Sequence, residues 1–304
     1  MMNKFLLTFA ILFVPGWLLS QKIDKKLQMK IAGIIKGFHG DIGIYVKNLR
    51  TSKTASVNED SLFPTASMIK VPIMIGVMDK IQKGELQYHQ NLEYRDSLIY
   101  AGVDILGSFK DGEKIELSKL LLLMLTMSDN TASLWLQSLA GGGARINYLL
   151  DSFGLIRTRV NSRTPGRENN RNLYGWGQTS PKEMAGIFEK IYKGELFNSQ
   201  VSERMMRLLG RDYWDEEAIS QIPPSVFVAC KNGAVDESRS ETLLVMAPHG
   251  AYIFSLTTKN LKDTSWSPDN EGWVLARKLS RLFWNYFEPQ SGFQPSTGLE
   301  GKLN

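Results

Sequence analysis

The sequence predicts a mixed fold, α/β plus all-α, with one antiparallel sheet of about five strands, flanking terminal helices and an inserted helical domain. Patterns typical of strands occur near both ends of the chain, whereas residues 66–196 carry mainly helical patterns. The chain has 304 residues, 43% of them hydrophobic, which is enough to bury the core of such an assembly. We therefore expect strands from both ends of the chain to form one sheet beside the helical block.

The first twenty residues have the pattern of a secretory signal peptide. Lys4 supplies a positive charge, residues 5–14 form an apolar run, and Ser20 is a small residue suited to cleavage. The alternative, an uncleaved anchor, needs a longer run, because a spanning helix takes roughly 20 apolar residues. We expect cleavage after Ser20, a secreted or periplasmic location, and no stable membrane insertion after cleavage.

A helix and a hairpin are expected to open the mature chain. Apolar residues recur at helical spacing over residues 23–36, and Gly37 is a plausible stop for this helix. Residues 41–49 alternate apolar and polar side chains, and residues 53–57 can pair with them across a short turn. This alternation predicts a β-hairpin.

The middle of the chain is expected to be helical. Nearly continuous apolar runs over residues 69–81 and 117–127 predict buried helices. Further helices are expected over residues 132–139 and, after a Thr-Ser-Pro start, over residues 181–192.

Strand patterns return in the last third of the chain. They cover residues 225–230, 241–247 and 251–258, the last two joined by a Pro-His-Gly turn. A final helix is expected through residues 273–283, and a tail rich in Gly, Pro and polar residues is expected to be loose. The expected domains are a signal peptide (1–20), an α/β domain (21–62 and 206–287), a helical domain that carries the nucleophile (63–205) and the tail (288–304).

Composition argues against several classes of function. The formal net charge is +5, but the 36 basic and 31 acidic residues are spread without a basic run, so no nucleic-acid partner is expected. Cys230 is the only cysteine, which excludes an intramolecular disulfide and a thiolate metal cluster. The three histidines lie far apart and form no zinc-binding motif. We expect a monomer without metal or cofactor.

Ser67-Met68-Ile69-Lys70 is the only S-x-x-K segment of the chain. Residues three apart at a helix start share a face, so Lys70 can reach the Ser67 hydroxyl. A lysine can activate a serine if burial or a nearby cation lowers its pKa, and the helix N-terminus offers N–H groups to an oxyanion. The alternative is a surface lysine, but the apolar neighbours predict a buried helix in which an unpaired lysine is costly.

Ser128-Asp129-Asn130 follows the second long apolar run. Ser128 offers a hydroxyl that can relay a proton to a leaving amine, and Asn130 offers an amide for a substrate carbonyl or for Lys70. The alternative is a helix N-cap, for which Ser, Asp and Asn are all suited. Both interpretations can hold together.

Lys231-Asn232-Gly233 closes a strand-like run. The segment would place a cation at the sheet edge, and its glycine would permit a close backbone approach. Taken alone, the segment indicates only a turn.

The three segments together, in this order, resemble the S-x-x-K, S-D-N and K-T-G set of class A β-lactamases and penicillin-binding proteins. Residues 62–67 and 179–185 also resemble the family's lead-in to the nucleophile and its threonine-proline helix start. The resemblance covers roughly residues 23–287 and implies the family's α/β-plus-helical fold. It implies the following roles: Ser67 as acylated nucleophile, Lys70 as its base, Ser128 as proton shuttle, Asn130 as substrate contact, Lys231 as carboxylate anchor, and the N–H groups of Ser67 and Ala234 as oxyanion hole.

Two departures from the family pattern bear on activity. Asn232 stands where the family has threonine, so an amide replaces a hydroxyl beside the substrate carboxylate. In the family, a loop carries a glutamate that activates the deacylating water, and an asparagine follows it four positions later. Glu168 and Asn172 have this spacing. The alternative for Glu168 is a solvated loop charge among Arg and Asn residues. Arg239 is a candidate for a second contact to the substrate carboxylate.

The leading hypothesis is hydrolysis of the β-lactam amide through a Ser67 acyl-enzyme. One alternative is a penicillin-binding serine peptidase or esterase of the same fold that releases its acyl group slowly. Another is a non-catalytic envelope sensor of penicillin or peptidoglycan. Absence of Lys70, Ser128 or Lys231 would favour this alternative, but all three residues are present. A Ser-His-Asp hydrolase is disfavoured because the chain has no G-x-S-x-G segment.

Overall fold

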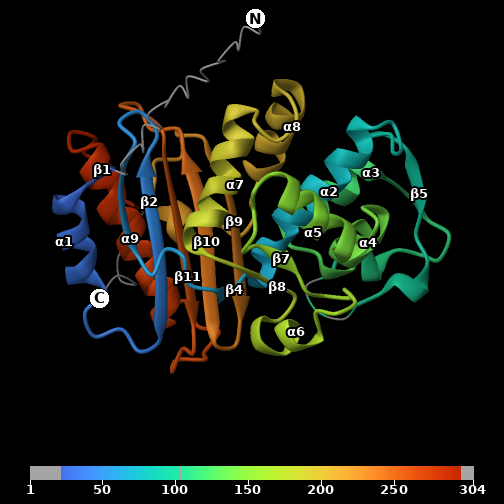
Figure 1. Ribbon diagram of the computed structural model, residues 1–304, viewed down its shortest axis with the longest axis horizontal. Helices are drawn as coiled ribbons and strands as arrows, with labels where there is room; N and C mark the ends of the chain where they lie inside the picture. Colours follow the sequence, from blue (N-terminus) through green and yellow to red (C-terminus); the bar gives the residue numbers. More distant parts are fainter. Residues whose placement is uncertain (1–21, 101, 103, 296–304) are drawn as a thin grey trace, which may run out of the picture.

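The computed structural model describes residues 22–100, 102 and 104–295, and the predicted signal peptide lies outside these residues. Its centre is a sheet in the order β1-β3-β2-β11-β10-β9, formed by both ends of the chain (Figure 1). Neighbouring strands are antiparallel, except that β1 pairs parallel with β3. The predicted fold class is therefore confirmed, with β1 as an additional edge strand. The strands are β1 (Lys22–Ile23), β2 (Asp41–Asn48), β3 (Lys53–Val57), β9 (Val228–Val235), β10 (Ser238–Val245) and β11 (Tyr252–Lys259).

The sheet is covered on both faces, which explains why its central strands are buried throughout. In β2, Ile44 and Val46 belong to the core shared with α1 (Lys25–Ile34) and α9 (Glu271–Phe287), whereas Tyr45 belongs to the core on the other side. This alternation follows from the two-residue period of a strand. The helix α7 (Pro181–Lys193) packs on the second face and contacts β2, β10 and β11.

Helix α1 begins later than the apolar spacing predicts. The side chain of Asp24 accepts a hydrogen bond from the Leu27 N–H at 3.1 Å and caps the helix. Ile23, the first residue of the predicted helix, instead lies in β1 and pairs with Thr54. Periodicity alone does not identify this start, because an apolar residue before the cap has the same spacing.

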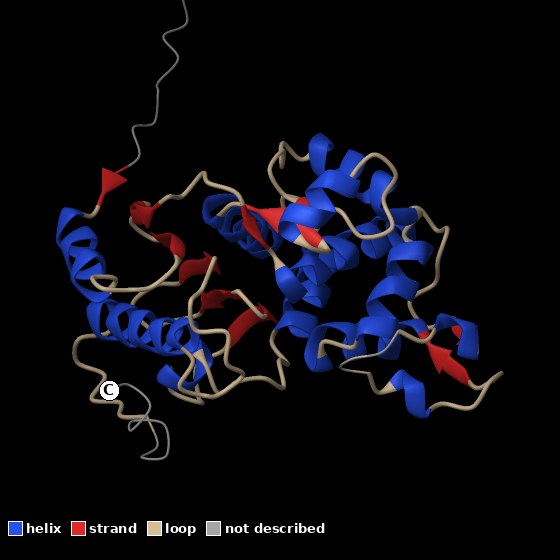
Figure 2. Cartoon of the chain, turned by 90° about the horizontal axis from the view of Figure 1, so that it is seen from below, coloured by secondary structure: helices blue, strands red, loops and turns tan. Residues whose placement is uncertain are grey.

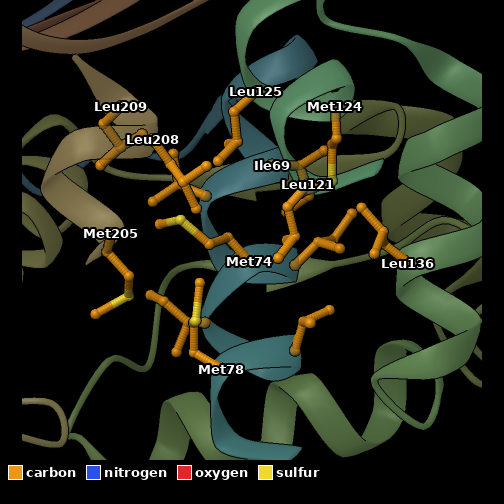
Figure 3. Packing of buried hydrophobic residues seen from close by; sticks show 14 of the residues in the cluster. Ile69, Met74, Met78, Leu121, Met124, Leu125, Leu136, Met205, Leu208 and Leu209 are labelled. Atoms are coloured by element: carbon orange, nitrogen blue, oxygen red, sulfur yellow. The ribbon is translucent and has the colours of Figure 1, made fainter. Parts of the chain in front are cut away.

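The helical part surrounds α2 (Lys70–Gln82), whose first ten residues are all buried. Figure 3 shows Met74 and Met78 of this helix among leucines and methionines of its neighbours. The surrounding helices include α3 (Leu117–Leu122), α4 (Asn130–Leu139), α5 (Gly142–Ser152) and α8 (Ser199–Leu209). Seen from below, these helices lie beside the sheet (Figure 2). The apolar run after α3 ends in a π-helical turn, η4 (Leu123–Met127).

Several short elements escaped the sequence prediction, so the region 66–196 is not purely helical. They are too short to produce a recognisable period of 2.0 or 3.6 residues. The added strands form two small sheets, β4-β8-β7 and β5-β6. The added short elements are β4 (Phe63–Pro64), β5 (Asn91–Glu93), β6 (Lys114–Glu116), β7 (Arg159–Val160), β8 (Gly177–Thr179), α6 (Glu168–Tyr174), η1 (Ala66–Ile69), η2 (Asp96–Leu98), η3 (Leu106–Ser108) and η5 (Ala218–Gln221). The longer helices α5 and α8, of 11 residues each, were also not predicted.

The segment after α9 differs from the loose tail that was expected. Glu288 is buried and accepts a hydrogen bond from the His249 N–H at 2.8 Å, and Trp284 donates to Ser291 at 3.0 Å. These contacts hold residues 288–295 against the α/β part, and residues 296–304 lie outside the described residues. The domain boundary expected after residue 205 falls inside α8, so one helix continues across it. No helix in the described ranges is both long and apolar enough to cross a bilayer.

Candidate active site

The segment before α2 places Ser67 in a strained turn. Ser67 lies in η1, and the preceding Ala66 has φ +44°, in the left-handed region that favours glycine. The Thr65 N–H donates to the Gly177 carbonyl at 2.9 Å and ties the turn to β8. A strained residue that its surroundings hold in place is typical of functional sites.

Lys70, the first residue of α2, connects the first two motifs. It is fully buried, and its Nζ lies 3.0 Å from the Ser67 Oγ and 3.0 Å from the Ser128 Oγ. The same atom lies 2.6 Å from the Ser128 carbonyl oxygen and 2.9 Å from the Asn130 Oδ1. The structure therefore brings together four side chains that the sequence places up to 63 residues apart.

The pKa of Lys70 is held well below its ordinary value. Burial is the main cause, and the nearby charge of Lys231 lowers the pKa further, whereas Asp129 and Asp212 partly oppose these effects. A neutral amine can donate its two N–H groups to the Ser128 carbonyl and Asn130, and accept a proton from Ser67. The site therefore contains a base beside a hydroxyl.

The second motif has both of the roles considered for it. Asp129 is the N-cap of α4, because its carboxylate accepts a hydrogen bond from the Ala132 N–H at 2.7 Å. Ser128 ends the π-helical turn with φ +60°, and this conformation directs both its carbonyl and its hydroxyl to Lys70. The capping residue thus positions the two flanking side chains that contact Lys70.

The third motif lies inside β9 and does not close a strand at Cys230 as expected. Its residues remain paired with β10, since Lys231 lies opposite Thr242 and Gly233 opposite Ser240. Lys231 is fully buried, and its Nζ lies 3.0 Å from the Asn232 Oδ1.

Asp212 was missed in the sequence analysis. Its Oδ2 lies 3.7 Å from the Lys231 Nζ, and both side chains are almost completely buried. The same oxygen accepts a hydrogen bond from the Cys230 thiol at 3.1 Å. Asp212 belongs to a loop without a motif, so only the tertiary contact identifies it as the partner of Lys231.

Gly233 allows β9 to approach the turn that carries Ser67. A Cβ atom at this position would lie 2.5 Å from the Ser67 nitrogen and 2.8 Å from the Thr65 carbonyl oxygen. Both neighbours are backbone atoms, which cannot move aside as a side chain can. The expected close backbone approach therefore occurs at Ser67 itself.

We expect Gly233→Ala to destabilise the protein by about 1–3 kcal/mol and to displace the Ser67 turn, because the added methyl group overlaps backbone atoms. Urea unfolding measures the change in stability. Gly186→Ala in α7 is the matched control, since no neighbouring atom lies within 4 Å of its Cβ position. This substitution should raise the free energy of unfolding by about 0.5–1 kcal/mol. Equal stability of the two variants would contradict the proposed contact.

A cleft of about 410 Å³ opens beside Ser67. Asn130 and Ala234 line it together with Ser67, so two of the predicted contact positions face the same space as the predicted nucleophile. Tyr100 and Trp176 form part of the wall, with ring centroids 5.0 Å apart. These aromatic residues were also missed, because isolated aromatic side chains have no spacing that predicts a shared wall. The remaining lining residues are Pro64, Ala66, Leu173, Tyr174, Gly175, Val235, Glu237, Ser238, Lys259 and Asn260.

The structure does not bring Glu168 and Asn172 into this cleft. Both are exposed, and the Glu168 Oε1 accepts a hydrogen bond from the Gly166 N–H at 3.1 Å. Glu168 is the first residue of α6, whereas residues 173–176, at the end of that helix and after it, line the cleft. The helical turn that places Leu173 at the cleft leaves Glu168 in solvent.

Arg239 does not offer a second contact to a substrate carboxylate, which corrects the expectation from sequence. It lies within β10 opposite Ala234, and its guanidinium donates to the carbonyls of Ser238 at 3.0 Å and Ser265 at 2.5 Å. The guanidinium also lies 4.8 Å from the centre of the Trp266 ring. Alternation along the paired strands places Arg239 on the sheet face opposite to that of Gly233.

The Asn232 amide is already engaged in part. It is buried, its Oδ1 faces Lys231, and its Nδ2 donates to the Trp214 carbonyl at 3.3 Å. It therefore positions Lys231 and the loop that contains Trp214. Its direct contact with a substrate stays a prediction.

Comparisons with known proteins identify the family of this chain. The model of a family described as the Beta-lactamase enzyme family matches residues 26–287. The chain is 24% identical over 275 residues to beta-lactamase VEB-1 of Pseudomonas aeruginosa, covering 86% of this chain and 90% of that protein. A mutant of PBP-A, solved as an acyl-enzyme complex with penicillin G, has a TM-score of 0.78 at 25% identity, covering 88% of this chain and 98% of its own. A class A beta-lactamase from Mycobacterium abscessus has a TM-score of 0.76 at 19% identity, covering 86% of this chain and 99% of its own.

Proposed function

Because the chain belongs to the beta-lactamase enzyme family, we propose that it opens the amide bond of β-lactams by forming an acyl-enzyme on Ser67. The observation that carries the proposal is the buried Lys70 Nζ, 3.0 Å from the Ser67 Oγ, with its pKa lowered well below the ordinary value. A positioned base of this kind activates a serine at neutral pH. The likeness to the PBP-A acyl-enzyme complex with penicillin G supports this choice of substrate.

The geometry supports the following acylation step. Lys70 accepts the Ser67 proton as Oγ attacks the lactam carbonyl carbon, and the N–H groups of Ser67 and Ala234 stabilise the oxyanion. When the carbon–nitrogen bond breaks, the leaving nitrogen takes a proton from the Ser128 hydroxyl, which is replenished by Lys70. The 3.0 Å distances from the Lys70 Nζ to both hydroxyls support this relay.

Lys231 is proposed to attract the substrate carboxylate. Its ammonium group is buried in β9, two residues before Gly233, which approaches the Ser67 backbone. Asp212 balances part of its charge from 3.7 Å. A buried lysine whose charge is only partly neutralised by a nearby carboxylate can still attract an anion, and the carboxylate lowers the cost of burying the lysine.

A second candidate function is supported by the position of Glu168. Release of the acyl group needs an activated water, and the exposed Glu168 lies outside the lining of the cleft. This arrangement favours a penicillin-binding serine hydrolase that is acylated readily but deacylates slowly. A non-catalytic sensor has less support, because the base, nucleophile and proton relay are all in contact.

One experiment separates these candidates. Purified protein is mixed with a chromogenic cephalosporin while mass spectrometry follows an adduct on Ser67. Sustained turnover supports a β-lactamase, a stoichiometric burst with a stable adduct supports the slowly deacylating hydrolase, and the absence of any adduct contradicts both.

We expect Glu168→Ala to release its acyl group at nearly the wild-type rate, because this carboxylate points into solvent. Single-turnover decay of the adduct measures this rate. Glu237→Ala is the matched comparison, because Glu237 is the one acidic residue that lines the cleft in the described part of the chain. A loss of roughly 100-fold or more in Glu168→Ala alone would instead identify Glu168 as the deacylation base.

A further inference from the structure

The positive charge of the chain is concentrated in one segment and is less evenly spread than its composition indicates. Residues 22–53 contain eight of the 36 Lys and Arg residues but only two of the 31 Asp and Glu residues. The rest of the chain therefore has 28 basic and 29 acidic residues and is nearly neutral. This segment forms β1, α1 and the β2–β3 hairpin, at one edge of the molecule (Figure 1).

Helix α1 displays much of this charge on its outer side. Leu27 and Ile31 are buried against the α/β core, whereas Lys25, Lys26 and Lys30 are exposed. Met29 lies among these lysines and is 69% exposed, and Ile23 just before the helix is 63% exposed. The main apolar face of α1 is buried in the protein core, so its outer surface offers lysines and single apolar side chains, which suit the head groups of an anionic membrane.

The lysines at the start of α1 oppose the helix dipole. Lys25 and Lys26 are its first two residues, and its first turn contains no acidic residue. Positive charges at a helix N-terminus cost free energy, so the stability of the helix does not explain them. A role in binding an anionic partner would explain them.

A groove runs between α1 and α9 on the same side of the molecule. Three lysines, Lys26, Lys30 and Lys53, line it with one carboxylate, Asp24, and with apolar residues that include Leu282 and Phe287, and its volume is about 590 Å³. In the described part of the chain, none of the three lysines forms an ion pair. Unpaired ammonium groups beside apolar side chains complement a phosphate that is linked to hydrocarbon.

We propose that the α1 face, defined by Ile23, Lys25, Lys26, Met29, Lys30 and Lys53, binds peripherally to an anionic phospholipid bilayer. The ammonium groups contact lipid phosphates, and the exposed apolar side chains enter the interface. Helix α1 covers the sheet face opposite to the helical part, so binding leaves the Ser67 cleft accessible.

Vesicle sedimentation tests the proposal. Protein purified from expressing cells, with its N-terminus determined by mass spectrometry, is mixed with vesicles of phosphatidylcholine alone or of phosphatidylcholine with added phosphatidylglycerol as the anionic lipid. We expect binding to the mixed vesicles only, and its loss at high salt. The triple variant Lys25→Glu, Lys26→Glu, Lys30→Glu should bind at least about 100-fold more weakly, because loss of each lysine removes roughly a fivefold factor and each new carboxylate adds repulsion.

The matched control reverses three lysines at the other end of the molecule, Lys110, Lys114 and Lys119. This variant should bind like the wild type. The α1 variant should keep its thermal stability, because Glu at positions 25 and 26 suits the helix dipole and position 30 is exposed. Equal binding of both variants, or equal binding to both kinds of vesicle, would overturn the proposal. Competition by inorganic phosphate at constant ionic strength would also overturn it, since it would indicate a site for a free anion.

Discussion

Ser67→Ala is expected to abolish covalent labelling by penicillin and to leave the fold intact. The substitution removes the proposed nucleophile, and the 3.0 Å contact to Lys70 disappears with it. Ser67 is half-buried at the cleft, so loss of one hydroxyl creates little cavity in the core. Intact-protein mass spectrometry measures the adduct, and thermal unfolding measures the fold.

Ser180→Ala provides the control for Ser67→Ala. Its hydroxyl caps α7 by accepting a hydrogen bond from the Glu183 N–H at 3.3 Å, away from the lining of the cleft. This variant should lose about 0.5–2 kcal/mol of stability but label fully. Undiminished labelling of Ser67→Ala would show that another residue is acylated.

Lys70→Met should slow acylation by about two orders of magnitude or more, the scale of a positioned proton-transfer group. Methionine fills most of the same volume, so the core around α2 should be preserved. Stopped-flow measurement of the burst provides the rate. Lys259→Met is the control, because Lys259 also lines the cleft but its Nζ donates to the Leu62 carbonyl at 3.1 Å.

The pH dependence of acylation tests the same role of Lys70. Only the neutral amine accepts a proton, so the wild-type rate should rise as pH rises through the pKa of Lys70, which lies well below its ordinary value. The rise should be missing in Lys70→Met. A wild-type rate that falls over the same range, or an unchanged profile in the variant, would assign the base to another group.

We propose that Lys231 and Asp212 connect substrate binding to this chemistry. The charge of Lys231 lowers the pKa of Lys70, whereas the charge of Asp212 raises it. A carboxylate bound at Lys231 would act in the same direction as Asp212, because both are negative. The buried pair therefore affects both the attraction of an anionic substrate and the proton affinity of the base.

Local patterns were sufficient for most of the fold. The β2–β3 hairpin and helices α2 and α7 occur within one or two residues of their expected bounds, because their periodicity or capping is local. The fold class is also confirmed, since the strands at both chain ends form one sheet. Short elements such as α6 could not be predicted, because about two turns of helix in a polar loop contain no apolar period.

The sequence by itself determined which residues can perform the chemistry. The three-residue spacing of Ser67 and Lys70 makes their contact a local property of the turn into α2. The buried character of α2 could also be read from its apolar neighbours, and burial is the main cause of the lowered pKa of Lys70. These conclusions need only a few consecutive residues.

The tertiary structure alone decided which side chains share the site. Asp212 reaches Lys231 across 19 positions of sequence, whereas Glu168 remains in solvent although residue 173 of the same helix lines the cleft. Arg239 faces α9 because the register of β10 places it on that side of the sheet. A shift of one residue in a strand, or of half a turn in a helix, reverses the direction of a side chain. The direction of each of these side chains depends on long-range packing, which cannot be read from the sequence.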